Sequence, residues 1–200
     1  AEMSGPARER LSLLRQGIER GRSLLDQLLT LAKVQSASES ILSPISIQGI
    51  YRRVLEDLMP LAEAKHIDIG VEGTQDVRVE VSELDMIALV KNLVDNAIRY
   101  TPEGGRVDLS VSGARGHTML RIQDTGPGIA LSERKRVFDA FYRTLGSGQA
   151  GSGLGLAIVQ AIANRIGAEI RFDFSDAQRQ TGLSVTVLIP KEDPTPAILP

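Results

Sequence analysis

The chain has 200 residues, 42% of them hydrophobic and 24% charged, with a net charge of −2 at pH 7. That size suits one full domain with an appendage, and the near-neutral balance gives no broad basic field for nucleic acid or anionic lipid. The absence of cysteine excludes disulfides, thiolate metal sites and cysteine nucleophiles, and the low aromatic content, 4% with no tryptophan, argues against a base-stacking platform for single strands.

A long helix is expected at the start of the chain, from Arg8 to about Ser36. Its apolar residues follow alternating three- and four-residue steps, which is the pattern of a helical bundle or coiled coil. The seam consists of Leu11, Leu14, Ile18, Leu25, Leu28 and Ala32, with Gly21 on the same line. One helix cannot bury such a stripe, so we expect partner helices from another chain or from sequence outside these residues, with packing onto the chain's own domain as the alternative.

The rest of the chain is expected to alternate between strands and helices. Residues 37–44 predict a linker and residues 191–200 a loose tail, which leaves 1–36 as a partial bundle helix and 45–190 as the main domain. Strands are expected at 45–47, 67–71, 77–81, 107–112, 118–123, 170–174 and 183–189. Helices are expected at 48–65, bent or broken near Pro60, at 83–100 after a Ser82 cap, and at 154–166 before Gly167. This mixture of hairpins and helices predicts a two-layer α/β sandwich.

Two amide side chains share one face of the helix that ends at Tyr100. Asn92 and Asn96 are four residues apart, with Arg99 and Tyr100 one turn further on. Amide oxygens are suitable ligands for Mg²⁺, which keeps several waters and bridges to substrate phosphates. Arg99 can meet phosphate charge, and the Tyr100 phenol can cover a sugar or a base. Asparagine is a poor mid-helix residue, so merely solvated or capping side chains are the weaker interpretation.

A carboxylate with two glycines directly follows a predicted strand, in Asp124-Thr125-Gly126-Pro127-Gly128. Because a carboxylate only accepts hydrogen bonds, Asp124 can hold an exocyclic amino group such as that of adenine. Gly126 and Gly128 allow a close backbone approach or a positive φ. An ordinary turn is the alternative, and the position of this segment downstream of the asparagine helix favours a binding site.

A glycine run opens the last predicted helix. Gly151, Gly153 and Gly155 can present backbone N–H groups and a helix N-terminus to phosphate oxygens. We interpret residues 144–153 as a mobile lid over such a site. Residues 146–151 also match the dinucleotide fingerprint G-x-G-x-x-G, but that fingerprint needs a buried strand before it and a helix opening within it, and neither is expected here.

Three residues precede the expected lid and are expected to anchor it or to neutralise phosphate charge beneath it. Phe138 and Phe141 are interpreted as anchors in the apolar layer, with plain core packing as the alternative. Arg143 can neutralise phosphate charge. The two histidines, His66 and His117, have no acid–base or metal-ligand partner at a useful spacing, so we expect ordinary surface or hydrogen-bonded side chains.

In this order, the motifs resemble the catalytic and ATP-binding domain of sensor histidine kinases of two-component systems, in the GHKL superfamily with the Bergerat fold. The resembling segments are 92–100 (N box), 124–129 (first glycine box), 138–143 (F box), 151–156 (second glycine box) and 182–190 (closing strand). The resemblance covers about residues 45–190 and implies a mixed sheet with helices on one face. The N-terminal helix is similar to the second helix of that family's dimerisation and phosphotransfer hairpin.

The resemblance implies ATP and Mg²⁺ as cofactors, and transfer of the γ-phosphoryl group to a histidine for relay to a response-regulator aspartate. It assigns the metal to Asn96 and catalytic roles to Asn92, Arg99 and Arg143. The nucleotide contacts that it implies are Asn92, Asn96, Arg99, Tyr100, Asp124, Gly126, Gly128, Ile129, Phe138, Arg143, Gly151, Gly153, Leu154, Gly155 and Leu156.

It also implies partners and a location. The expected partners are a second copy, which dimerises through the N-terminal helix of the full-length protein, and a response regulator; no nucleic acid is expected. The expected location is the cytoplasmic portion of an inner-membrane sensor. No apolar run here approaches the roughly 20 residues that span a bilayer, so the membrane would be reached only through segments outside these residues.

One departure from the family pattern is large. The family phosphorylates a histidine that is followed by an acidic residue, whereas His66 precedes Ile67 and His117 precedes Thr118. We therefore expect a fragment, a kinase core that lacks its own phosphoacceptor helix and does not phosphorylate itself.

Two alternatives stay open, a GHKL-type ATPase and a nucleotide-sensing pseudokinase module. In the gyrase-like, Hsp90-like and MutL-like ATPases a glutamate four residues before the metal asparagine activates water, and this sequence has Asn92 there. Transfer by positioning and metal electrostatics needs no such base, which favours phosphotransfer over hydrolysis. The presence of Asn96, Asp124 and the lid glycines counts against a pseudokinase.

Overall fold

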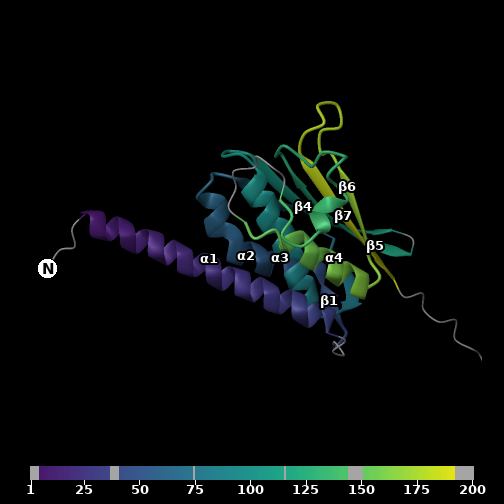
Figure 1. The fold of residues 1–200 in the computed structure, drawn as a ribbon. Helices are drawn as coiled ribbons and strands as arrows, with labels where there is room; N and C mark the ends of the chain where they lie inside the picture. The colour runs from purple at the N-terminus through teal and green to yellow at the C-terminus, as the bar shows by residue number, and fades with distance from the viewer. Residues whose placement is uncertain (1–4, 37–40, 74, 115, 144–150, 192–200) are drawn as a thin grey trace, which may run out of the picture.

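The computed structural model describes residues 5–36, 41–73, 75–114, 116–143 and 151–191 (Figure 1). Helices and strands alternate along most of the chain. In order they are α1 (Gly5–Gln35), β1 (Ser43–Ser46), α2 (Ile47–Glu63), β2 (Asp68–Glu72), β3 (Arg78–Val81), α3 (Glu83–Tyr100), β4 (Arg106–Ala114), β5 (His117–Asp124), the 3-10 turn η1 (Arg136–Phe138), α4 (Gly155–Arg165), β6 (Glu169–Asp173) and β7 (Leu183–Pro190). The predicted two-layer α/β class is confirmed.

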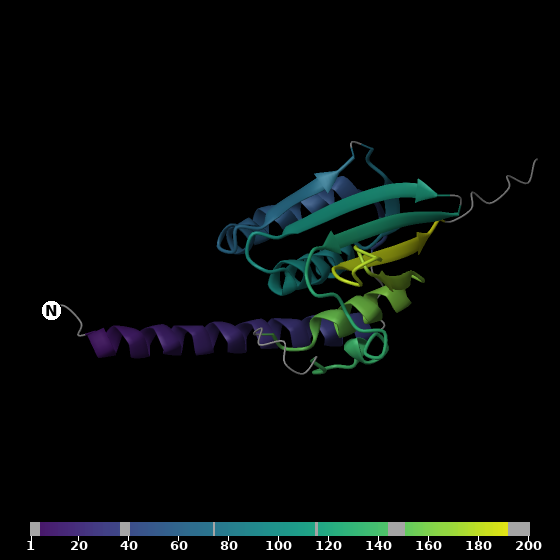
Figure 2. The same cartoon turned by 90° about the horizontal axis from the view of Figure 1, so that it is seen from above.

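The main sheet has five strands in the order β2-β4-β5-β7-β6. β2 pairs with β4 in parallel and every other neighbour is antiparallel, so the sheet is mixed as expected. β1 and β3 form a separate antiparallel pair. In Figure 2 the sheet and α1 lie on opposite sides of α4.

The core lies between the sheet and the helices α2, α3 and α4. β5 shows why the layers form, since its residues alternate between buried and partly exposed along the strand. Leu120 and Ile122 point from β5 into the core. α3 is the central helix of the helical layer and lies against both α2 and α4. Its buried residues are Asp85, Met86, Leu89, Val90, Leu93, Val94, Ala97 and Ile98.

The ends of α3 are fixed by side chains. At its start the Ser82 hydroxyl accepts a hydrogen bond from the Asp85 N–H (3.4 Å), which confirms the predicted cap. At its end the Thr101 hydroxyl donates to the Ala97 carbonyl (2.6 Å). The helix that carries the asparagines is therefore held at both termini.

Two details of α2 differ from the prediction. The strand expected at 45–47 ends at Ser46, because the Ser46 hydroxyl accepts from the Gly49 N–H (2.9 Å) and starts a helix at Ile47. Of the break or bend expected near Pro60, the break is wrong, since α2 continues to Glu63. Pro60 removes one N–H donor from the helix, and only three helical residues follow it.

The long helix α1 packs onto the domain along one line and leaves its predicted seam open. Leu24 and Leu31 pack against the core, Val34 is buried, and α1 lies against α4. The exposed apolar residues of α1 are Leu11, Leu13, Leu14, Ile18, Leu25, Leu28 and Leu29. Figure 1 shows the N-terminal half projecting away from the domain. α1 therefore packs onto its own domain, as the alternative interpretation expected, only along one face of its C-terminal half.

Candidate functional site

The asparagine face of α3 meets the start of α4. A Cβ atom placed on Gly155 would lie 3.1 Å from Asn92 Oδ1 and 3.5 Å from Asn96 Nδ2, so only glycine allows this approach without displacing an amide. The Asn92 amide nitrogen donates to the Ala88 carbonyl (2.8 Å), which fixes the side chain on the helix. Two amide side chains and the N-terminus of α4 thus lie side by side, an arrangement that suits a hard cation next to a phosphate.

Arg99 and Tyr100 lie at the far end of the same helix. The Arg99 Nε donates to Asp95 Oδ2 (2.6 Å), an ion pair one helical turn apart that orients the guanidinium. Tyr100 is partly exposed, and its carbonyl oxygen would lie 2.9 Å from a Cβ atom on Gly126. The end of α3 is therefore in contact with the loop that follows Asp124.

Asp124 is buried at the end of β5, with 6% of its surface exposed. Its Oδ1 accepts from the N–H groups of Gly126 (2.8 Å) and Leu183 (3.2 Å). Burial raises the pKa of Asp124 to about 6, and the two N–H groups only partly offset that increase by favouring the charged form. A buried carboxylate held by two backbone donors is a rigid hydrogen-bond acceptor.

Two glycines beside Asp124 are required by close contacts. A Cβ atom on Gly126 would lie 2.9 Å from Asp124 Oδ1, and Gly128 has φ +79° with the Gly182 carbonyl oxygen 2.7 Å from its Cβ position. Gly182, also at positive φ, donates its N–H to the Gly126 carbonyl (2.7 Å). The loop after β5 is thus clamped against the start of β7.

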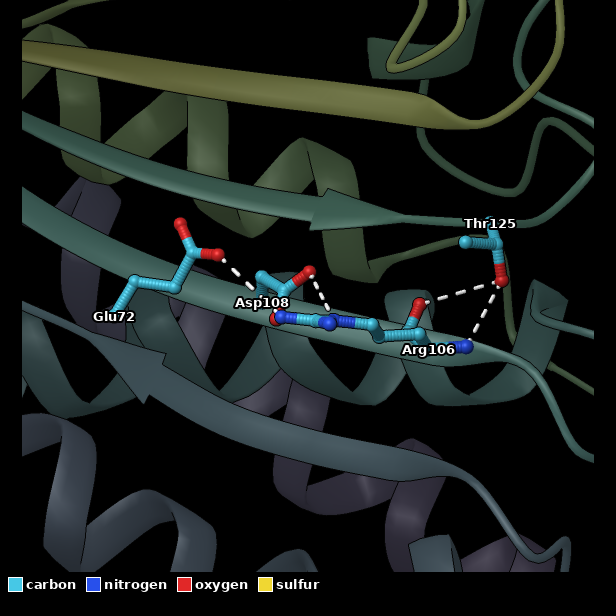
Figure 3. Close-up of polar contacts among 4 residues, drawn as sticks. All are labelled: Glu72, Arg106, Asp108 and Thr125. Carbon is cyan, nitrogen blue, oxygen red and sulfur yellow. Dashed lines mark hydrogen bonds and ion pairs between the residues drawn. The ribbon is translucent and has the colours of Figure 1, made fainter.

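Thr125 fixes the other side of this loop to β4 (Figure 3). Its hydroxyl accepts from the Arg106 N–H (2.9 Å), and its own N–H donates to the Arg106 carbonyl (3.1 Å). The Arg106 guanidinium lies along the strand, with Nε 2.7 Å from Asp108 Oδ2 and Nη2 3.5 Å from Glu72. These carboxylates raise the pKa of Arg106, so it remains a cation at the edge of the loop.

The segment before the lid is anchored as predicted at one phenylalanine and not at the other. The Phe138 ring stacks on Phe172 with centroids 5.1 Å apart, whereas Phe141 is largely exposed. Phe141 has φ +65°, and its N–H donates to the Gly153 carbonyl (3.0 Å). A Cβ atom on Gly153 would lie 2.8 Å from the Phe141 carbonyl carbon, so a glycine is needed there.

The remaining predicted site residues fall into three groups. Leu154 is fully buried and Leu156 packs against the core, so their side chains belong to the apolar layer. Gly151 and Arg143 are exposed, and Ile129 is half-buried. Residues 144–150 of the predicted lid (144–153) and most of the rejected fingerprint lie outside the described residues.

Several contributors to the site carry no sequence signal. Lys65, at the end of the α2 region, donates from Nζ to the carbonyls of Ile98 (2.8 Å), Arg99 (2.8 Å) and Thr101 (2.5 Å), and burial lowers the pKa of its amine. It thereby caps the end of α3. The Ser175 hydroxyl donates to the Asp124 carbonyl (2.6 Å). Both side chains bond to residues that are distant in sequence, and no local sequence pattern indicates such contacts.

A buried ion pair between α3 and α4 was also not predicted. Arg165, in the last turn of α4, contacts the Asp85 carboxylate in the first turn of α3. This pair joins the two helices at the ends opposite Asn96 and Gly155. The two histidines are exposed, with His66 3.8 Å from Glu103, as expected for surface residues.

Comparison with known proteins decides the family. The profile of the histidine kinase-, DNA gyrase B-, and HSP90-like ATPases matches residues 81–193, more than half of the chain. The chain belongs to this family. The matched stretch contains the asparagine face, the Asp124 loop and the glycines before α4. Lys65, His66 and Glu72, whose contacts are described above, lie before it.

Relatives of this family member include sensor proteins. The swarming motility regulation sensor protein RssA of Serratia marcescens is 35% identical over 166 residues, which are 82% of this chain and 35% of that protein. The sensor protein kinase PmrB of Pseudomonas aeruginosa is 37% identical over 185 residues, 90% of this chain and 37% of that protein. The chain thus spans about a third of the length of these relatives.

Solved structures give the same result for the fold. A mycobacterial sensor histidine kinase, MprB, aligns with a TM-score of 0.67 and 32% identity over 75% of this chain and 97% of that one. Full-length ShkA in complex with AMPPNP aligns with a TM-score of 0.77 and 29% identity over 95% of this chain and 40% of that one. The mixed sheet with its helical layer is therefore the fold of the histidine kinase catalytic domain.

Two other features are missing from the part of the chain that the structure describes. Across the described ranges, no helix has the length and apolarity to cross a membrane. Within the same residues, no group of three or more histidine, aspartate or glutamate side chains is arranged to hold a metal ion.

Proposed function

We propose that this chain is the ATP-binding catalytic core of a two-component sensor histidine kinase. It would transfer the γ-phosphoryl group of ATP to a histidine on a helix outside these 200 residues, for relay to a response-regulator aspartate. The observation that carries the proposal is the approach of Gly155 to Asn92 and Asn96, which unites a cation-binding face with a helix N-terminus. Asp124 lies at the other end of the same site, next to the end of α3.

The residues fit a nucleotide bound with Mg²⁺, because glycine at 126 and at 155 leaves room where a Cβ atom would press on Asp124 or Asn92. When bound, Mg²⁺ would supply positive charge that offsets the charge of the phosphates. Asn96 and Asn92 would supply its amide oxygen ligands or hold its waters. Asp124 would accept from the adenine amino group and thereby orient the base.

The phosphate end would be served by cations and backbone donors. Arg99, oriented by Asp95, and Arg143 beside the lid would offset the negative charge of the phosphates. The start of α4, at Gly153 and Gly155, would direct N–H groups to phosphate oxygens. Tyr100, Ile129 and Phe138 would form the apolar and aromatic border of the nucleotide site. Closure of the lid would exclude water from the reacting phosphate.

Hydrolysis is the second candidate function, and Asn92 argues against it. A hydrolase of this superfamily needs a general base there, and a carboxamide has no proton-accepting role of that kind. The Asn92 amide is moreover bonded to the Ala88 carbonyl, so the side chain is held for binding and not for proton abstraction. Direct transfer to an incoming imidazole needs no water-activating base, since the neutral imidazole nitrogen is itself nucleophilic.

The proposal includes a dimer and a location. The open seam of α1 would pack in a helical bundle with a second copy and with the phosphoacceptor helices, because an isolated leucine stripe of this kind is unfavourable in water. The sensor relatives suggest a cytoplasmic kinase portion of a membrane protein. The residue division proposed above, 1–36 for the bundle helix and 45–190 for the catalytic domain, follows from that arrangement.

Nucleotide binding can be tested by calorimetry with AMPPNP, with and without Mg²⁺. In Asn96→Ala we expect the affinity with Mg²⁺ to fall about tenfold or more and the affinity without it to stay the same, because only the metal ligand is lost. Asn164→Ala is the matched control, since Asn164 is exposed on α4 and its side chain accepts a hydrogen bond only from Gln160, one helical turn away, in the described structure. Equal metal dependence in Asn96→Ala and the parent would contradict the assignment.

Transfer can be tested by adding a helix with a histidine followed by an acidic residue, in trans or fused before Ala1, together with γ-labelled ATP. We expect acid-labile label on that helix and none on the chain alone. Label on His66 or His117 would contradict the fragment interpretation. Release of phosphate without label on any helix would favour the ATPase candidate.

A further inference from the structure

Arg134 lies between the Asp124 loop and η1, and its guanidinium is held without a carboxylate among the described residues. Its Nε donates to the Ile129 carbonyl (3.3 Å), and its Nη1 donates to the Phe172 carbonyl at the end of β6. Its guanidinium carbon lies 4.8 Å from the centre of the Phe174 ring. One side chain thus joins the segment after the first glycine box to β6 and to the loop beyond it.

Arg106 gives the contrasting case within the same molecule. Its guanidinium is exposed and pairs with two carboxylates, Asp108 and Glu72 (Figure 3). Such an exposed pairing contributes little and is screened by salt. Arg134 instead has a buried Nη2 with no hydrogen-bond partner in the described part of the chain. A buried donor left unpaired is unfavourable, so a role in packing alone would be met better by leucine.

The contacts of Arg134 continue to the base-reading carboxylate. The Phe174 ring that it covers lies 3.1 Å from the Cβ position of Gly128. Gly128 in turn lies against the Gly182 carbonyl, Gly182 donates to the Gly126 carbonyl (2.7 Å), and the next N–H, that of Leu183, donates to Asp124. The links are the Arg134 side chain on the Phe174 ring, backbone contacts among Gly128, Gly182 and Gly126, and one backbone N–H that donates to the Asp124 carboxylate. Because these groups are closely packed, we expect a displacement at Arg134 to reach Asp124.

We propose that Arg134 is a positioning residue for base recognition, which clamps the glycine loop and the β6–β7 connection so that Asp124 presents its free acceptor to adenine. This inference rests on the proposed function, in which Asp124 reads the base. Arg134 does not touch the nucleotide in this arrangement. It acts through Phe174, Gly128 and Gly182, which set the backbone around the carboxylate.

The test measures the affinities of an ATP analogue and a GTP analogue by calorimetry, well below the melting temperature of each variant. In Arg134→Leu we expect adenine affinity to fall about tenfold and the preference for adenine over guanine to fall by a similar factor, the size of effect that a lost charge-assisted hydrogen bond produces. Hydrogen exchange at 126–128 and 182–183 should become faster. Lys135→Leu, a change at the neighbouring exposed cation, should leave all three quantities unchanged.

Two further variants keep the test decisive if Arg134→Leu does not fold. Arg134→Lys keeps the charge but cannot reach both carbonyls, and Phe174→Leu keeps the carbonyl contacts but removes the ring. Both should lose part of the base preference. If all folded variants melt at lower temperature yet keep the parent's affinity and base preference, Arg134 is merely structural and the inference is overturned.

Asp124→Asn, measured in parallel, separates this inference from the proposed function. A parent without adenine preference, or an Asp124→Asn variant that keeps it, would remove the base-reading role and this inference with it. A preference that is lost in Asp124→Asn but kept in the Arg134 and Phe174 variants would overturn the role of Arg134 alone.

Discussion

α1 and α3 are both amphipathic helices with apolar residues three and four apart, yet the domain buries the apolar face of α3 and leaves most of that of α1 exposed. α3 is capped at its start by Ser82, is held at its end by Lys65, and buries its apolar face between α2, α4 and the sheet. α1 has one packed line and leaves most of its leucines in solvent. Helical periodicity is therefore the same in a finished core helix and in a helix that still lacks partners.

This difference shows that the rigidity of the candidate nucleotide site comes from α3. The functional side chains of α3 stand on a helix fixed at both ends and joined to α4 by the pair Asp85–Arg165. Among the described residues, α1 makes one side-chain hydrogen bond to the proposed phosphate loop (residues 151–154), in which the Ser152 hydroxyl donates to Gln27. We expect substitutions in α3 to affect folding of the domain, whereas substitutions in α1 should affect association and the loop.

The largest expected difference is between matched leucines. Leu89 on α3 is 0% exposed and Leu14 on α1 is 62% exposed. Leu89→Ala should lower the free energy of unfolding by about 3 kcal/mol through lost burial and a cavity, whereas Leu14→Ala should change it by less than about 0.5 kcal/mol. Urea denaturation of the two variants measures this. Equal losses would mean that α1 is part of the folded core.

The second prediction tests the ion pair that joins α3 to α4. Arg165→Leu leaves the Asp85 carboxylate buried without its partner, so the free energy of unfolding should fall by about 3 kcal/mol. The double change Asp85→Leu with Arg165→Leu should recover most of that loss, because no charge is then buried. Urea denaturation of the single and double variants gives both values. A double variant as unstable as the single one would mean that the loss comes from altered packing.

The third prediction concerns pH and Asp124, next to the end of α3. Burial raises its pKa from 3.8 to about 6, so the folded state binds more protons than the unfolded state between these values. Stability should therefore fall as pH rises from about 4 to about 6, and the complete loss from this group, reached above pH 6, should be roughly 3 kcal/mol.

Asp124→Asn isolates this contribution from the other titrating groups. At pH 7 the variant should be more stable than the parent by roughly 3 kcal/mol, and the difference should disappear below about pH 4. The same variant should lose the preference for adenine over guanine. The Asp124 carboxylate would then favour nucleotide binding while it lowers the stability of the fold. A constant difference across the pH series would show that the carboxylate is not desolvated as described.

The smallest expected effect is at the contact between α1 and the phosphate loop. Gln27→Ala removes the acceptor for Ser152 and should change the free energy of unfolding by about 1 kcal/mol or less. Hydrogen exchange at 151–154 should nevertheless become faster, and AMPPNP should slow exchange across 144–153 in the parent if that segment is a lid. An exchange pattern that AMPPNP leaves unchanged would count against the lid.

The sequence predicted the elements well because their signals are local. The Ser82 cap, the end of the last helix at Gly167 and the alternation of β5 each involve residues within one or two turns or along one strand. The start of α2 was predicted one residue late, at 48 instead of Ile47. The pattern at 45–47 favours a strand, and it does not show that the Ser46 hydroxyl caps the helix. The functional roles of Asn92, Asn96 and Asp124 remain predictions, since their placement fits a nucleotide but their chemistry awaits the experiments above.

By itself the sequence determined the periodicity of the helices, the polar and glycine residues of the site and their order along the chain. Only the tertiary structure decided which helical stripe is covered, that Lys65 caps α3, that Arg165 meets Asp85, and that Asp124 accepts from a residue 59 positions away. The physical reason is that propensity and capping act over a few residues, whereas desolvation, ion pairing and a shifted pKa depend on what long-range packing brings together.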